Sequence, residues 1–217
     1  MGFDFGIVLY IFGSMSSLFS DTYNEIENNS ETQLRERGSK FISYSFKVHS
    51  DEEIKNNLQS LKQKYPDASH HCYAYILGQG QEAQRANDDG EPTGSAGRPI
   101  LRAILSQELT NVLVVVVRYF GGTLLGIPGL ISSYGDGAKS VLNLSGKIEK
   151  VQQIEYEVSS KFENEQEIHK LLKPFDFDVK DRAYTDKVTY KVAIRRSQAE
   201  AFEKGLKEAY LLESQFS

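Results

Sequence analysis

The sequence has no tryptophan, two methionines, five prolines and a single cysteine among its 217 residues. A lone cysteine, Cys72, excludes an internal disulfide and is typical of a reducing compartment, so we expect a cytoplasmic protein. Excess positive charge is also lacking, because 25 Lys and Arg stand against 30 Asp and Glu. The resulting pI of about 5.5 excludes an overall field that would attract nucleic acid or an anionic membrane.

Long apolar runs are lacking as well. Residues 6–13 are apolar, but this stretch is far shorter than the ~20 residues that a membrane span requires. A secretory signal begins with basic residues, whereas Asp4 is the only charge before this stretch. We therefore expect no membrane association. Residues 1–32 are predicted to be an N-terminal extension, partly disordered, in which Met15 is a candidate natural start.

The hydrophobic content of 40% and charged content of 25% are ordinary for a globular protein, and periodicity predicts an α+β fold. Alternating residues predict strands at 40–48 and 71–77. Ser50 and Glu53 predict a capping box that begins a helix ending before Pro66. Residues 112–117 are apolar without alternation, which predicts a central strand covered on both faces. Further helices are expected at residues 100–107 and 130–144.

The pattern restarts near residues 146–151, which predicts a first domain at 33–147 and a second at 148–217. In the second half, strands are expected near residues 154–159, 175–179, 188–194 and 210–212, with helices at 168–172 and 199–209. Ser197 and Glu200 predict a capping box for the last helix. This order of elements is the β-α-β-β-α-β plan.

Two glycine-rich loops in the first half indicate a site. Residues 88–99 combine acidic side chains, glycines and two prolines, and residues 118–122 follow the buried strand with the sequence Arg-Tyr-Phe-Gly-Gly. Such composition suits a shaped loop whose backbone approaches another group closely. The glycines could instead serve close packing of a helix against the sheet, and both interpretations stay open.

Complete cofactor and metal patterns are not found. The spacing from Gly121 to Gly126 resembles a phosphate-binding loop, but Ile127 and Pro128 stand where Lys and Ser or Thr are needed. Around the acidic residues the calcium-loop pattern fails, because Arg85 occupies its first ligand position. We therefore predict no cofactor, no metal site and no catalytic residue.

The charged residues of these loops allow two other interpretations. Arg118 beside the glycines could hold a phosphate or a carboxylate. The acidic residues could also pair with Arg98, Arg102 or Arg118 and so organise the surface, which is the interpretation we favour. A Cys–His dyad is disfavoured, because His71 and Cys72 are adjacent on a strand and point to opposite faces.

A basic stripe in the second half is a possible nucleic-acid contact. Lys187, Lys191 and Arg195 share the outward face of one predicted strand. Glu155 and Glu157 are expected to face this stripe from a neighbouring strand, so cross-strand ion pairs are the default explanation.

The two loop motifs, together with the segment His70-His71-Cys72-Tyr73-Ala74-Tyr75, resemble the YigZ/IMPACT family over residues 33–217. The resemblance implies a first domain with the ribosomal protein S5 domain 2-like fold and, in bacterial members, a ferredoxin-like second domain. The family's signature falls on Asp88, Asp89, Gly90, Glu91, Pro92, Gly94, Gly97, Arg118, Tyr119, Gly121, Gly122, Gly126, Gly129, Tyr134 and Gly135. Our predicted binding surface consists of Asp88, Asp89, Gly90, Glu91, Pro92, Gly94, Arg98, Arg118, Tyr119, Gly121, Gly122, Gly126 and Tyr134.

The resemblance implies a role in translation. Eukaryotic members act in translational control through an activator of a protein kinase and carry an extra N-terminal domain. Residues 1–32 are too short for that domain, so the chain resembles a bacterial-type member of two domains. We predict a non-enzymatic regulator that contacts the ribosome, RNA or a translation-related protein. The alternative is an enzyme, or a protein that binds a small molecule or a metal, with a cleft between the loops at 88–91 and 118–122.

Overall fold

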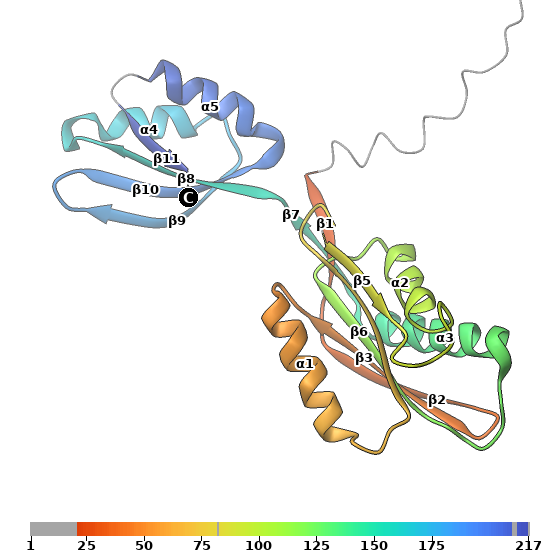
Figure 1. The fold of residues 1–217 in the computed structure, drawn as a ribbon. Coiled ribbons are helices and arrows are strands. Elements are labelled where there is room, and N and C mark those ends of the chain that lie inside the picture. The colour runs from red at the N-terminus through yellow and green to blue at the C-terminus, as the bar shows by residue number, and fades with distance from the viewer. Residues whose placement is uncertain (1–20, 82, 210–211, 217) are drawn as a thin grey trace, which may run out of the picture. The chain divides into compact units, whose positions relative to one another are not determined.

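The computed structural model in Figure 1 describes residues 21–81, 83–209 and 212–216. The chain divides into two compact units, the first being Tyr23–Lys150 and the second comprising residues 21–22 together with the described residues from Val151 onward. The division lies three residues beyond the boundary that we predicted after residue 147. Both units combine helices with β-sheets, so the protein has a mixed α/β fold of two units.

A five-stranded antiparallel sheet forms the centre of the first unit. Its strands lie in the order β2 (Ser30–Glu36), β3 (Ser39–Lys47), β6 (Val112–Tyr119), β4 (His70–Leu77) and β5 (Ala83–Asn87). Residues 112–117 of β6 are fully buried, in agreement with the predicted central strand. Because neighbouring residues of β6 point to opposite faces, each face has its own core.

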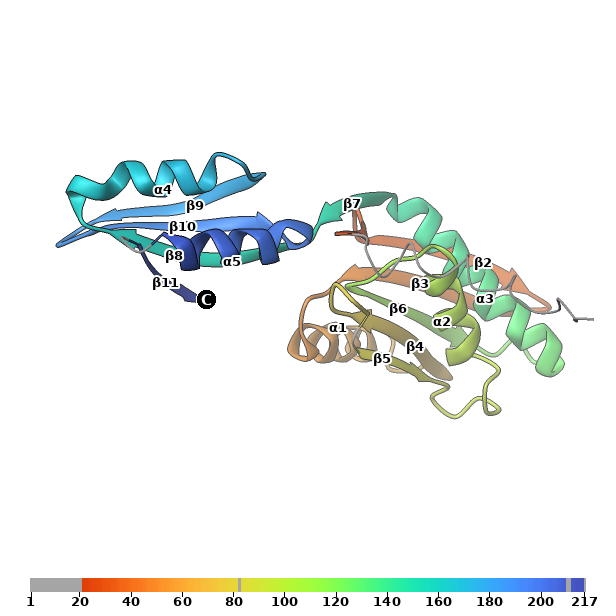
Figure 2. The ribbon, with the colours of Figure 1, turned by 90° about the horizontal axis from the view of Figure 1, so that it is seen from above.

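Helices cover both faces of this sheet (Figure 2). On one face lies α1 (Asp51–Lys64), whose Ile54 and Leu61 pack against Val115. On the other lie α2 (Gly97–Ser106) and α3 (Gly126–Ser145). As predicted, the Ser50 hydroxyl caps α1, accepting the backbone N–H of Glu53 at 3.2 Å.

The N-terminal region of the first unit differs from the prediction. Residues 21–32 were assigned to an extension, but Thr22–Ile26 form β1 and β2 begins at Ser30. β1 pairs with β7 (Lys147–Val151) in a two-stranded sheet. The prediction missed β2 because its residues are exposed or half-buried and mostly polar, so apolar alternation is weak there. Residues 1–20, where partial disorder was expected, lie outside the described residues.

The second unit has the predicted β-α-β-β-α-β order of elements. These are β8 (Gln153–Ser160), α4 (Glu165–Leu172), β9 (Phe177–Tyr184), β10 (Val188–Arg195), α5 (Ala199–Glu208) and β11 (Glu213–Phe216). The sheet order is β11-β8-β10-β9, and every pairing is antiparallel. The core includes Tyr156, Val192 and Phe202.

Two details of the second unit were predicted wrongly. Ser197 does not cap α5, because it lies in a short 3-10 turn, η2 (Arg196–Gln198), and its hydroxyl donates to Asp21 at 2.6 Å. The last strand begins at Glu213 instead of residue 210. Residues 210 and 211 lie outside the described residues.

Across the part of the chain that the structure describes, no helix is both long and apolar enough to cross a bilayer.

Candidate functional site

Asp88 shapes the loop between β5 and α2, which we call the acidic loop (residues 88–96). Its carboxylate accepts backbone N–H groups from Gly94 at 2.8 Å, Ala96 at 3.0 Å and Gly97 at 2.8 Å. Partial burial alone would raise the pKa of Asp88, but these three donors outweigh it and leave the pKa below its ordinary value. The acidic loop is therefore folded around a charged carboxylate.

The next two residues form the corner of the acidic loop. Asp89 and Gly90 both have positive φ, at 43° and 89°. The Asp89 carboxylate accepts the backbone N–H of His71 at 2.6 Å, and its own N–H donates to the side chain of Asn87 at 2.8 Å. These bonds tie the corner to β4 and to the end of β5, and Asp89 and Gly90 remain exposed.

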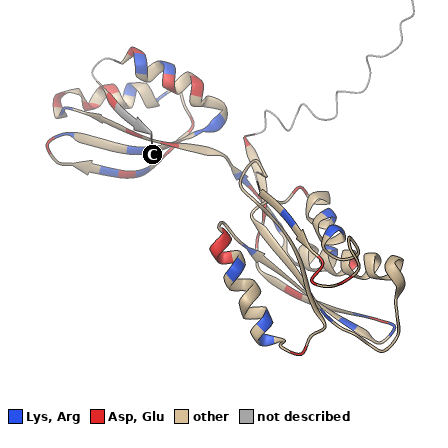
Figure 3. Cartoon of the chain, in the orientation of Figure 1, with Lys and Arg blue, Asp and Glu red and all other residues tan. Residues whose placement is uncertain are grey.

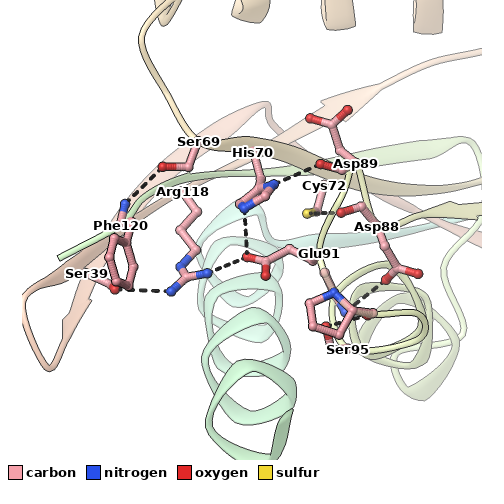
Figure 4. A network of polar contacts seen from close by, with 12 residues as sticks. Ser39, Ser69, His70, Cys72, Asp88, Asp89, Glu91, Ser95, Arg118 and Phe120 are labelled. Atoms are coloured by element: carbon pink, nitrogen blue, oxygen red, sulfur yellow. Dashed lines mark hydrogen bonds and ion pairs between the residues drawn. The ribbon is translucent and has the colours of Figure 1, made fainter. Parts of the chain in front are cut away.

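Glu91 joins the acidic loop to the helical layer and to β6. Its Oε1 atom lies 2.6 Å from Nη1 of Arg118 (Figure 4). The same oxygen accepts the Tyr134 hydroxyl at 2.7 Å. His70 approaches the same oxygen from the other side, with Nε2 at 3.7 Å. The side chains of Glu91 and Arg118 are only 4% and 6% exposed. Burial, together with the bond to Glu91, raises the pKa of Tyr134, so the phenol stays protonated and donates.

Arg118 also contacts the residues at the start of the glycine loop, which we define as residues 120–125. Its Nη2 lies 3.4 Å from the Ser39 hydroxyl, and Ser39 in turn accepts the N–H of Gly121 at 3.2 Å. The guanidinium stands over the rings of Phe41 and Phe120, at 5.5 and 5.7 Å. Its Nε has no hydrogen-bond partner among the described residues.

These contacts distinguish between the two interpretations of the charged residues in the acidic loop and at Arg118. The predicted pairing of the acidic residues with Arg118 is confirmed for Glu91. The carboxylate that Arg118 holds is therefore supplied by the chain itself. At Glu91 and Arg118 the two segments are in direct contact through an ion pair, whereas the cleft between residues 88–91 and 118–122 stays a prediction. Arg98 and Arg102 are exposed, and the Arg98 side chain extends beside Gly94.

The glycines of the glycine loop serve different purposes. A Cβ on Gly121 would lie 1.9 Å from the backbone of Gly38, so this glycine permits close packing against the β2–β3 turn. Gly122, and Gly126 at the first position of α3, have positive φ, at 83° and 70°, and a Cβ at either would meet no atom closer than 3.9 Å. The packing interpretation therefore holds at Gly121, whereas the other two glycines set the direction of the chain where it enters α3.

The predicted binding residues separate into an interior and an exposed set. Glu91, Arg118 and Tyr134 are buried, and Asp88 and Gly94 are half-buried. Tyr119 is half-buried, and its hydroxyl donates to Asp67 at 2.8 Å. The exposed set is Asp89, Gly90, Pro92, Arg98, Gly121, Gly122 and Gly126.

Sequence reasoning missed the apolar side chains that accompany the exposed set. Phe120 is 49% exposed, Leu124 83% and Ile127 55%. The sequence contains one signal of their exposure, because they lie in a glycine-rich stretch without regular periodicity. Such a stretch cannot bury every apolar side chain that it carries.

Cys72 lies behind the acidic loop. The Sγ atom is 3.0 Å from the carbonyl oxygen of Asp88 and 3.3 Å from the Tyr134 hydroxyl. The side chain is fully buried, which raises the pKa of its thiol well above the ordinary value. Cys72 is therefore a packed, unreactive thiol at neutral pH.

The basic stripe of β10 is largely paired. Lys187 lies 3.0 Å from Glu213, and Arg195 is 3.9 Å from both Asp21 and Asp176. Ion pairing was expected, but these carboxylates differ from the predicted ones. Glu157 faces the third basic residue, Lys191, across the β8–β10 register without a close contact, and Glu155 faces Ala193.

No cluster of three or more His, Cys, Asp or Glu side chains suited to a metal ion occurs among residues 21–81, 83–209 and 212–216.

Comparison with known proteins decides the family. Residues 37–142 match the Impact N-terminal domain, and residues 161–210 match a domain of unknown function, DUF1949. The IMPACT family member YvyE of Bacillus subtilis is 32% identical over 193 residues, covering 86% of each chain. This chain belongs to the IMPACT family. The member YigZ of Escherichia coli is 32% identical over 166 residues, which cover 76% of this chain and 81% of YigZ.

A solved crystal structure of a protein described only as hypothetical is 26% identical to this IMPACT-family chain, with a TM-score of 0.65. The match covers 91% of this chain and 98% of the other. The likeness therefore extends over both units.

Proposed function

We propose that this IMPACT-family chain is a non-enzymatic, cytoplasmic regulator of translation that binds the ribosome, RNA or a translation-related protein. Membership of the family supports the link to translation, since the resemblance implies translational control for eukaryotic members. The ion pair between Glu91 and Arg118 is the observation that supports a non-enzymatic role. Both charged groups, with the Tyr134 phenol, are engaged in holding two loops together, and such groups are poorly placed to transfer protons to a substrate.

We propose that the partner binds the exposed set of signature residues together with Phe120 and Leu124. The interior residues fix the shape of both loops, and the exposed ones then present a preorganised surface. Apolar side chains as exposed as Leu124 commonly mark interaction sites when they gather. We prefer this surface to the basic stripe at Lys187, Lys191 and Arg195, because acidic neighbours already pair with two of those three cations.

We further propose the finer fold assignment. The first unit has the ribosomal protein S5 domain 2-like fold and the second the ferredoxin-like fold. The sheet order β11-β8-β10-β9 and the β-α-β-β-α-β succession support the second assignment. Domains that resemble those of translation factors are consistent with contact to the translation apparatus, by analogy of fold alone.

Affinity purification of the tagged chain from a native lysate tests the function. We expect ribosomal components, RNA or translation factors to be recovered, and Leu124→Ser to reduce their recovery. Leu144→Ser is the matched control, because Leu144 is also exposed, at 62%, near the other end of α3. An RNase-treated sample separates partners held through RNA from directly bound proteins. Repeated recovery of none of these components would refute the proposal.

A further inference from the structure

A groove of about 770 Å³ lies between α1 and the strands β4 and β5. On one side it is lined by Lys55, Leu58 and Lys62 of α1, and on the other by Tyr73, Tyr75 and Arg85. None of these residues belongs to the family signature surface described above. No local sequence motif marks the groove, because its residues come from three elements.

Two tyrosines form the floor of the groove on the sheet. Tyr73 and Tyr75 are alternate residues of β4, so their side chains point to the same face. The rings are parallel within 3°, and their centroids are 6.5 Å apart. Both side chains are half-buried against the core beneath α1, which fixes them while part of each ring stays accessible. Fixed, accessible rings are the platforms on which unpaired bases stack.

Three cations flank these rings. Lys55 and Lys62 are seven residues apart on α1, about 10 Å along the helix axis. Arg85 lies directly opposite Tyr75 in the β4–β5 register, and therefore on the same face. All three side chains are exposed. Figure 3 shows the basic positions of α1 following its acidic first turn.

The local charge is opposite to that of the whole chain. Three cations and one carboxylate, Asp51, line the groove, whereas the chain has a net charge of −5. Considering the described residues alone, Lys55, Lys62 and Arg85 take part in no ion pair. These cations are therefore available to a ligand, unlike Lys187 and Arg195 of the second unit.

We propose that this groove binds single-stranded RNA, with bases stacked on Tyr73 and Tyr75 and phosphates against Lys55, Lys62 and Arg85. The inference rests on the proposed function, in which RNA is one of the three partner classes. An acidic peptide would use the cations but leave the parallel tyrosines without a role. A duplex would present paired bases that cannot reach the rings, so the ligand is a single strand.

Fluorescence anisotropy with the purified full chain and a labelled oligouridine of about 12 nucleotides tests this site. The groove variant combines Lys55→Gln, Lys62→Gln and Arg85→Gln. We expect it to bind at least about tenfold more weakly between 50 and 200 mM salt. The slope of log affinity against log salt should fall in magnitude by about 2, because each phosphate contact to a single strand contributes about 0.7.

The control variant combines Arg35→Gln, Arg102→Gln and Lys139→Gln, which removes the same charge from exposed positions of the same unit. It should change the affinity by less than about twofold. Tyr75→Leu should weaken binding about fivefold or more with an unchanged salt slope, whereas Tyr75→Phe keeps the ring and the affinity. Thermal melting of each variant establishes that it is folded.

The site would be overturned if the unaltered chain bound no RNA, or if the groove variant and the control variant lost RNA affinity equally. It would also be overturned if Tyr75→Leu kept full RNA affinity and oligoglutamate displaced the RNA. The last result would identify an acidic-peptide groove. The anisotropy test uses purified components, so its outcome is independent of the lysate experiment that tests the proposed function. A groove variant that loses RNA yet still recovers translation proteins from lysate shows that the two sites act independently. RNA binding by the purified chain, combined with recovery of no ribosomal component, RNA or translation factor from lysate, refutes the proposed function and leaves the RNA-binding groove standing.

Discussion

Nη1 of Arg118 lies 2.6 Å from Oε1 of Glu91, and both side chains are buried although one ends a central strand and the other lies in an acidic loop. The contact joins positions 27 residues apart in the chain. It brings the two signature loops together and fixes their backbones. Each charged side chain can be buried only because the opposite charge of the other compensates for its loss of solvation.

Removing one partner of this pair should destabilise the first unit strongly. We expect Glu91→Gln to cost about 3–5 kcal/mol, because Arg118 would remain buried and uncompensated. Arg118→Met combined with Glu91→Gln should cost less than the sum of the two single changes. Urea denaturation of the three variants measures this coupling. Additive costs would contradict a direct interaction between the two residues.

Asp88 should stabilise the protein in a pH-dependent way. Its pKa is lowered in the folded state, because three backbone donors outweigh partial burial. A lowered pKa contributes stability above the unfolded value of about 4, and this stability is lost as the pH falls through the folded value. Asp88→Asn should therefore cost about 1–2 kcal/mol at pH 7 and progressively less below pH 4. A constant cost over this range would contradict the account.

Gly121 should tolerate no side chain. A Cβ there would lie 1.9 Å from the backbone of Gly38, so Gly121→Ala must separate the β2–β3 turn from the glycine loop. We expect a loss of more than about 3 kcal/mol, whereas Gly122→Ala, with positive φ but open space, should cost about 1–2 kcal/mol. Thermal unfolding of both variants gives the comparison. Equal losses would show that conformation at these positions matters more than packing.

The Cys72 thiol should react slowly in the folded protein. Burial raises its pKa, so little thiolate exists at pH 8 and the reagent has no access. We expect modification by a disulfide reagent to be at least about 100-fold slower than in urea-unfolded chain. The rate should rise in Glu91→Gln, because the loop that covers Cys72 loses its anchor. Fast modification of the unaltered folded chain would contradict the burial.

Sequence patterns predicted the strands and helices in which buried apolar residues recur at regular spacing. They did not reveal the elements that lack such spacing. The apolar run at residues 112–117 identified β6, because a strand covered on both faces has no polar side. β2 escaped notice because Leu34 is the one apolar side chain among its residues. Pairing of Glu91 with Arg118 was one of the predicted alternatives. The burial of Glu91 could not be predicted, since an acidic residue in a glycine-rich loop is ordinarily solvated.

Sedimentation of native lysate through a sucrose gradient tests the central claim most directly, because it measures the association with the translation apparatus itself. We expect the tagged chain to move with ribosomal or translation-factor fractions. We also expect Leu124→Ser to shift the chain toward the top of the gradient, whereas Leu144→Ser should not. A chain that stays at the top in every form, without RNA or translation proteins beside it, would contradict the account.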